Sequence, residues 1–202
     1  MEAGNVLRDC PELRSKSATN KAHGGKLTNR LVTGKRAAHL AAEARGLPAV
    51  RLSPFELSDP EMLSIGGFSP LEGFMTRADY ESVVRNMRLG NGLPWSLPIT
   101  LAVTAEAAEQ LRGQTRVALA DGEGEPLAVL IVEDVFTYDR EAEARAVFRT
   151  TETAYPGVAY LAPRGEWLIS GVVEVFRRAN NRAFAKYRLD PADTRRILAE
   201  RG

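Results

Sequence analysis

The run His23-Gly24-Gly25-Lys26 contains the residue types best suited to binding an anion. Two glycines let neighbouring backbone amides point toward one ligand, and the lysine adds positive charge. The same pattern is typical of an ordinary turn that leads into a strand, because glycine pairs supply the backbone conformations that turns need. We favour the turn, and we assign no ligand to this run.

The remaining nucleophilic and metal-ligating side chains are few and scattered. His39 falls within a predicted alanine-rich helix, which favours a helix-surface residue, and Cys10 lies in a polar stretch that does nothing to activate a thiol. With one cysteine and two histidines, a zinc site would need carboxylates to complete it. The sequence contains no phosphate-binding loop, dinucleotide-binding glycine motif or nucleophile elbow. We therefore predict no catalytic, cofactor-binding or metal-binding residue.

Seven arginines are the best candidates for a basic surface patch. They are Arg140, Arg145, Arg149, Arg164, Arg177, Arg178 and Arg182. Five glutamates are interleaved with them, namely Glu141, Glu143, Glu152, Glu166 and Glu174. This alternation favours a solvated surface of mixed charge over a nucleic-acid site.

Two further clusters have ordinary structural interpretations. Gly122 and Gly124 lie among acidic residues that would repel a phosphate, so we predict a turn there. Four aromatic residues are close in sequence and are better explained by core packing than by a ligand cage. They are Phe68, Phe74, Tyr80 and Trp95.

Length and composition indicate one good-sized domain, or two small ones, with a packed core. The chain has 202 residues, of which 44% are hydrophobic, and its formal net charge is +1. A near-neutral chain gives no global electrostatic reason to bind nucleic acid or an anionic membrane. No apolar run is long enough to span a bilayer, the N-terminus does not resemble a secretory signal, and a single cysteine favours a cytoplasmic location.

The hydrophobic pattern predicts short strands with helices inserted between them, after a polar tail or arm at residues 1–20. The predicted helices are 34–45, 60–65, 76–87, 104–111, 139–149 and 191–200. The predicted strands are 27–32, 49–52, 98–103, 116–120, 127–132 and 167–176. Thr33, Thr76 and Asp190 are the expected caps. Gly171 is a possible bulge. This order predicts an α+β domain built around a curled sheet or small barrel.

Five segments together resemble the N-terminal region of bacterial ATP sulfurylases, also called sulfate adenylyltransferases. They are residues 22–30, 66–74, 86–95 with 97–101, 150–158 and 187–195. The segments occur in the order found in the family and cover about residues 21–202. Tyr155 departs from the family pattern, which has histidine before the Pro-Gly pair.

The resemblance implies a PUA-like domain, which is a mixed β pseudo-barrel with peripheral helices, at residues 21–176. Residues 177–202 are then expected to form a junction segment and helix leading to a catalytic domain outside this chain. In the family that second domain joins ATP, with magnesium, and sulfate into adenosine 5′-phosphosulfate and pyrophosphate. The resemblance thus implies no cofactor for this chain, the catalytic domain of the same parent as partner, and a homo-oligomeric, cytoplasmic enzyme that involves no membrane.

One run matches only the first part of the family's nucleotide-binding motif. Gln114-Thr115-Arg116 matches the start of the family's Gln-Thr-Arg-Asn-Pro motif, but Val117 and Ala118 follow, with no histidine downstream. We therefore predict that the chain alone is inactive and has a structural or assembly role. The alternative is a free-standing PUA-like binding module, for example for RNA. Whether the parent works in sulfate assimilation or in the ATP-forming direction stays open.

Overall fold

A computed structural model describes residues 21–178 and 187–201, and its centre is a six-stranded mixed sheet. The strands are β1 (Ala49–Arg51), β2 (Gly73–Phe74), β3 (Leu101–Val103), β4 (Arg116–Ala120), β5 (Pro126–Thr137) and β6 (Trp167–Val175). Their order is β1-β4-β5-β6-β2, and β3 also pairs with β6. The predicted tail at residues 1–20, with Cys10, and Arg182 lie outside the described residues.

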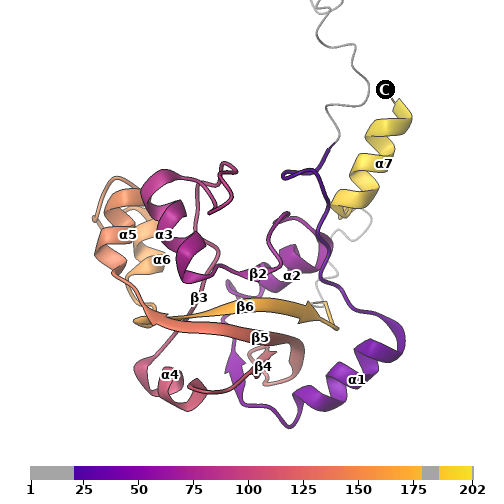
Figure 1. Cartoon of the computed structure of the whole chain (residues 1–202), viewed down its shortest axis with the longest axis horizontal. Helices are drawn as coiled ribbons and strands as arrows, with labels where there is room; N and C mark the ends of the chain where they lie inside the picture. Colours follow the sequence, from indigo (N-terminus) through magenta and orange to yellow (C-terminus); the bar gives the residue numbers. More distant parts are fainter. Residues whose placement is uncertain (1–20, 179–186, 202) are drawn as a thin grey trace, which may run out of the picture.

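Seven helices surround this sheet in the described part of the chain. They are α1 (Gly34–Ala44), α2 (Ser58–Ile65), α3 (Arg77–Asn86), α4 (Ala105–Leu111), α5 (Arg140–Val147), α6 (Pro156–Leu161) and α7 (Pro191–Arg201). Figure 1 shows α3, α5 and α6 gathered at one end of the sheet, α1 at the other, and α7 standing away from it. The α+β prediction is confirmed. The sheet is open, since no pairing among the described strands joins β1 to β2 or β3.

The two faces of the sheet bury separate groups of side chains. Alternate residues of a strand point to opposite faces. On one face Ala118 of β4 and Val129 of β5 pack against Leu40 and Ala44 of α1. The spacing of four residues between Leu40 and Ala44 predicts that they share one apolar helix face. The opposite face carries the larger core, which contains Val117, Leu119 and Leu130 together with side chains of α2, α3 and α4. None of the described helices is both long and apolar enough to span a membrane.

The long β5–β6 pair has an irregularity opposite Gly171, where the sequence predicts a bulge. The register shifts between Val132 and Asp134, and Gly171 has a φ of 144°. The prediction that the strand ends at Val132 is wrong, because the strand continues through the polar residues that follow, which lie at this bulge. Glu133 is exposed and Asp134 is half-buried, so β5 continues to Thr137 without burying an unpaired charge.

The strand predicted at residues 27–32 is wrong, since only Leu31 forms a bridge, parallel to Val175. The segment is hydrogen-bonded to both α2 and β6. The Arg30 amide donates to the Leu63 carbonyl of α2, and the Val32 amide donates to the Val175 carbonyl of β6. Two elements, α6 and β2, are missing from the predicted set. With six and two residues they are too short for a periodic pattern to be visible.

The predicted helix caps have different outcomes. The Thr76 hydroxyl accepts a hydrogen bond from the Asp79 amide, as predicted, whereas Thr33 occupies the N-cap of α1 without a side-chain bond. The spacing of apolar residues places Met87 on the apolar face of α3. Met87 instead ends that helix in the left-handed conformation, with φ 52°, and its side chain is exposed, so the expectation is wrong.

Candidate functional site

Three of the five family-like segments, far apart in the sequence, meet in one place. We call residues 22–30, 66–74 and 86–95 the motif cluster. The Thr28 amide donates to the Ser69 hydroxyl at 2.8 Å, and the His23 Nε2 atom lies 2.8 Å from the Pro94 carbonyl oxygen. A Cβ added to Gly24 would lie 3.1 Å from atoms of both Pro70 and Leu93. The segments that carry the resemblance are therefore packed against one another.

The glycines of residues 66–74 serve close packing rather than phosphate binding. Gly66 ends α2 in the left-handed conformation, with φ 77°, and its carbonyl accepts a hydrogen bond from the Ser69 hydroxyl. Gly73 lies directly on β6, where an added Cβ would be 1.9 Å from the Gly171 carbonyl oxygen. Any side chain at residue 73 would push β2 away from β6, so the glycine is required by the sheet.

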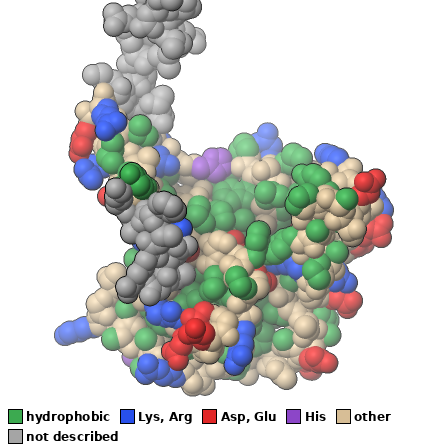
Figure 2. Space-filling view, turned by 180° about the vertical axis from the view of Figure 1, so that it is seen from behind, with side chains coloured by type: hydrophobic (Ala, Val, Ile, Leu, Met, Phe, Trp, Pro, Cys, Tyr) green, Lys and Arg blue, Asp and Glu red, His purple; other side chains and the backbone are tan. Residues whose placement is uncertain are grey.

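The motif cluster presents a partly exposed aromatic surface. The Trp95 ring lies 6.0 Å from the His23 ring and 6.4 Å from the Phe68 ring, and its Nε1–H donates to the Leu97 carbonyl. The core-packing prediction for the four aromatics is confirmed: Phe74 and Tyr80 are buried, and Phe68 and Trp95 pack partly buried against the same core. Figure 2 shows hydrophobic side chains over the middle of one molecular face, with charged side chains mostly toward its edges.

The predicted anion-binding candidate is a turn. The Gly25 amide donates to the Ala22 carbonyl at 2.8 Å, and both Gly24 and Gly25 have positive φ. His39 lies exposed on α1, as expected for a helix-surface residue. Arg116 begins β4, which confirms that residues 114–116 enter a strand. In residues 21–178 and 187–201 no group of three or more His, Cys, Asp or Glu side chains is placed to hold a metal ion.

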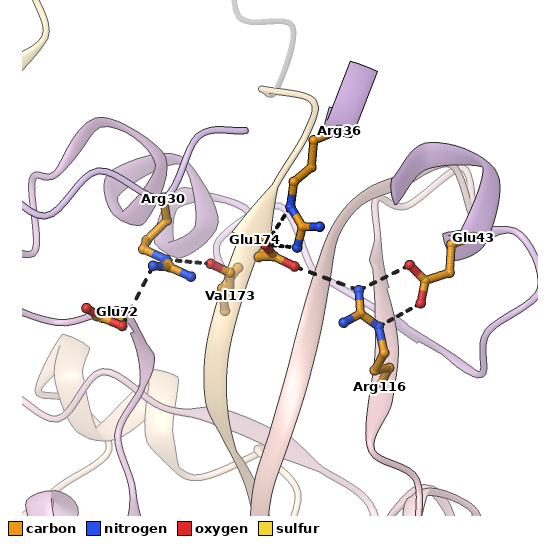
Figure 3. Close-up of polar contacts among 7 residues, drawn as sticks. All are labelled: Arg30, Arg36, Glu43, Glu72, Arg116, Val173 and Glu174. Atoms are coloured by element: carbon orange, nitrogen blue, oxygen red, sulfur yellow. Dashed lines mark hydrogen bonds and ion pairs between the residues drawn. The ribbon is translucent and has the colours of Figure 1, made fainter. Parts of the chain in front are cut away.

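A network of charged side chains ties α1 to the sheet (Figure 3). Glu174 of β6 is buried, and Arg36 of α1 reaches it at 2.6 Å. Arg116 of β4 lies 3.7 Å from the same carboxylate and 2.6 Å from Glu43 of α1. Two arginines balance two glutamates in charge. The network has no unmatched charge with which to attract a ligand.

Arg30 makes a second set of contacts beside this network (Figure 3). Its Nε donates to the Val173 carbonyl at 2.9 Å, and its NH1 lies 3.7 Å from Glu72. The Val175 amide in turn donates to the Arg30 carbonyl. Arg30 therefore holds the end of the first family-like segment against β6.

The buried Glu143 and the half-buried Asp59 have raised pKa values, and both shifts are caused first by burial. Burial raises the pKa of Glu143, which accepts a hydrogen bond from the Tyr80 hydroxyl at 2.9 Å. Burial raises the pKa of Asp59 to about 6, against an opposing effect of the nearby Arg164. Arg164 donates to the hydroxyl and carbonyl of Thr100, so its guanidinium is held in the structure. The Arg164 guanidinium lowers the pKa of both acids and so opposes the effect of burial.

The described arginines of the predicted basic patch largely have acidic partners, which confirms the mixed surface. Arg140 lies 3.5 Å from Glu166, Arg145 pairs with Glu141, and Arg177 lies 2.8 Å from Asp121. Asp121 also accepts hydrogen bonds from the Glu123 and Glu125 amides, which confirms the predicted acidic turn. This pairing does not favour the RNA-binding alternative.

Arg178 differs from the other arginines of the predicted patch because its guanidinium pairs with carboxylates from two distant segments. It follows β6, its NH2 lies 3.3 Å from Glu61 of α2, and its NH1 lies 3.1 Å from Asp190, just before α7. We call Glu61, Arg178 and Asp190 the junction clasp. The sequence marks Asp190 as a helix cap and Arg178 as one arginine of seven, but no local signal points to Glu61.

The junction also contains a groove and a helix with no fully buried residue. A groove of about 570 Å³ lies between α2 and residues 187–190, and its apolar lining includes Leu57, Met62 and Ile65. No residue of α7 is buried, and Leu198 is 56% exposed. Leu189 and Tyr187, which precede the helix, are also exposed.

The fold and the motif cluster define a PUA-like domain. A family profile described as a PUA-like domain matches residues 20–178, and the chain belongs to this family. The chain also matches part of proteins named sulfate adenylyltransferase, the family that the five segments resemble.

Two relatives and one solved structure illustrate the match. The chain is 49% identical to the "Probable bifunctional SAT/APS kinase 2" of Sorangium cellulosum and 44% identical to the sulfate adenylyltransferase of Synechococcus sp. (strain JA-3-3Ab), each over 89% of this chain. It covers 31% and 46% of those proteins. A structure described as the hexameric APS kinase from Thiobacillus denitrificans matches 90% of this chain and 32% of its own, with a TM-score of 0.69 at 31% identity. The chain thus spans less than half the length of each.

Proposed function

We propose that this chain serves as the N-terminal domain of a sulfate adenylyltransferase and that its role there is to hold and position the catalytic part. The observation that carries the structural role is α7. An isolated helix of 11 residues is marginal in water, and α7 buries none of its residues against the domain. Its exposed Leu198, with Leu189 close by in sequence, gives it an apolar surface for a partner.

The proposal assigns the chemistry to the rest of the parent protein. ATP with magnesium and sulfate would bind there, and the products would be adenosine 5′-phosphosulfate and pyrophosphate. No described residue of this chain forms a metal cluster, and the incomplete Gln114-Thr115-Arg116 run leads into the sheet. The isolated chain is therefore expected to have no turnover, and its contribution is to orient α7.

The assembly and the location belong to the same proposal. The Thiobacillus protein is described as hexameric, which supports a homo-oligomeric parent enzyme. The whole sequence has a single cysteine, so an internal disulfide is impossible, and a reducing cytoplasm suits the protein.

A chimeric enzyme tests the proposal. This chain replaces the matching part of the Synechococcus sulfate adenylyltransferase, to which it is 44% identical, and pyrophosphate release is measured with ATP and sulfate. We expect an active chimera, an inactive enzyme when the matching part is deleted, and no activity from the 202-residue chain alone. Turnover by the pure chain, or an inactive chimera that is folded, would overturn the proposal.

A further inference from the structure

The junction clasp is a point at which the start of α7 contacts the folded domain. Arg178 contacts Glu61 through NH2 and Asp190 through NH1, so one guanidinium holds two carboxylates from different elements. The three side chains are each about one-fifth to one-third exposed. Solvent therefore screens these pairs less than the pair between Arg196 and Glu200 on α7, whose side chains are about 60% exposed.

The α2 side of the clasp is a fixed support. Leu63 is 1% exposed, and its carbonyl accepts a hydrogen bond from the Arg30 amide at 3.1 Å. The buried Ser64 hydroxyl donates to the Glu61 carbonyl at 2.7 Å. Because α2 is packed into the core in this way, the Glu61 carboxylate starts from a backbone that cannot move without disturbing the domain.

The α7 side of the clasp controls where that helix starts. The Thr194 amide and hydroxyl both donate to the Asp190 carbonyl, so residue 190 belongs to the first turn of α7. The same residue's carboxylate is held by Arg178. Moving Asp190 therefore moves the first turn of the helix with it.

We infer that Arg178 is a positioning residue that sets the direction in which α7 leaves the domain. The planar guanidinium presents separate nitrogen atoms to the two carboxylates at a set angle, which the single ammonium of lysine cannot reproduce. That the direction of α7 serves to orient a catalytic part rests on the proposed function. The clasp itself is a property of this chain.

The test measures the position of α7 relative to the sheet in the full 202-residue chain. Cys10 is replaced by serine, and spin labels are attached to cysteines at Glu106 of α4 and Ala199 of α7, both exposed. The distribution of distances between the labels is measured by pulsed electron paramagnetic resonance. In R178A and in R178K we expect the width of that distribution to at least double.

Arg177→Ala is the matched control. Arg177 is the neighbouring residue and also pairs with a carboxylate, Asp121, but its other contacts are carbonyls at residues 125 and 126, away from α7. The control should leave the distribution unchanged. Glu61→Gln and Asp190→Asn should each broaden it, and thermal unfolding of every variant verifies that the core is intact.

An unchanged distribution in folded R178A, or in E61Q, would overturn the inference. So would an equal broadening in the Arg177→Ala control, because the effect would then be general. The distances are measured without any enzyme activity. An inactive chimera would therefore refute the proposed function alone, whereas an unchanged distance would refute the clasp alone.

Discussion

The motif cluster and the junction clasp both involve α2 and are built in opposite ways. In the motif cluster, Gly66 and the buried Ser69 bring residues 66–74 against residues 22–30, through close packing and a hydrogen bond from the Thr28 amide to the Ser69 hydroxyl. At the junction, Arg178 joins the start of α7 to the body through side-chain ion pairs, and no residue of α7 is fully buried. The three family-like segments of the motif cluster therefore contribute to the packing of the fold. The candidate functional contact lies at its edge, where packing is incomplete.

The largest expected effect is in the sheet, at Gly171→Ala. The residue has φ 144°, and an added Cβ would lie 1.9 Å from the Ile131 carbonyl oxygen, so the backbone of β5 would have to move. We expect the free energy of unfolding to fall by more than about 3 kcal/mol. Urea unfolding followed by tryptophan fluorescence measures it. Gly122→Ala is the control, with no atom within 4 Å of the new Cβ. Equal stability of the two variants would contradict the prediction.

Asp59→Asn should stabilise the protein at neutral pH. Burial raises the pKa of Asp59 from 3.8 to about 6, so the protonated form favours folding below pH 3.8, and this contribution is lost as the pH rises through about 6. Asparagine stays neutral, and we expect a gain of about 1–3 kcal/mol in the free energy of unfolding at a pH of about 7.5. The gain should shrink at a pH of about 4.5, where less of the carboxyl is ionised in the folded state. Urea unfolding at both pH values measures the gain in the free energy of unfolding. A gain that is the same at both pH values would refute the ionisation argument.

Glu174→Gln should weaken the attachment of α1 to the sheet. The change removes the charge that Arg36 and Arg116 share, while one acceptor oxygen remains. Because Arg36 is more than half exposed, we expect a loss of about 1–2 kcal/mol in the free energy of unfolding. Glu81→Gln is the matched control, since its pair with Arg85 is exposed. Equal losses in chemical denaturation would show that the buried position of Glu174 has no special effect.

The smallest expected effect is at the junction, at Leu198→Ser. Leu198 is 56% exposed, so its removal should change the free energy of unfolding of the isolated chain by less than about 0.5 kcal/mol. Leu40→Ala on α1 is the comparison, because Leu40 is fully buried and should cost about 2–5 kcal/mol. In the chimeric enzyme, Leu198→Ser should lower activity or assembly. A large loss of stability in the isolated chain would mean that α7 is part of the core.

Elements with strong local signals can be predicted from the sequence without further help. The apolar face of α1, the Thr76 cap of α3 and the irregularity at Gly171 each depend on residues a few positions apart, and all three are confirmed. The resemblance supplied the fold family, because five short segments occur in a characteristic order. Weak or interrupted local patterns failed, as at residues 27–32 and at the end of β5.

Which of many similar residues meet is set by the tertiary structure. Arg178 and Glu61 are 117 residues apart, and no spacing singles out this pair among 27 basic and 26 acidic residues. The same holds for Thr28 with Ser69 in the motif cluster. Periodicity and capping reflect contacts within one or two helical turns. A contact between distant side chains depends on the order of strands and the seating of helices, which only the folded chain sets.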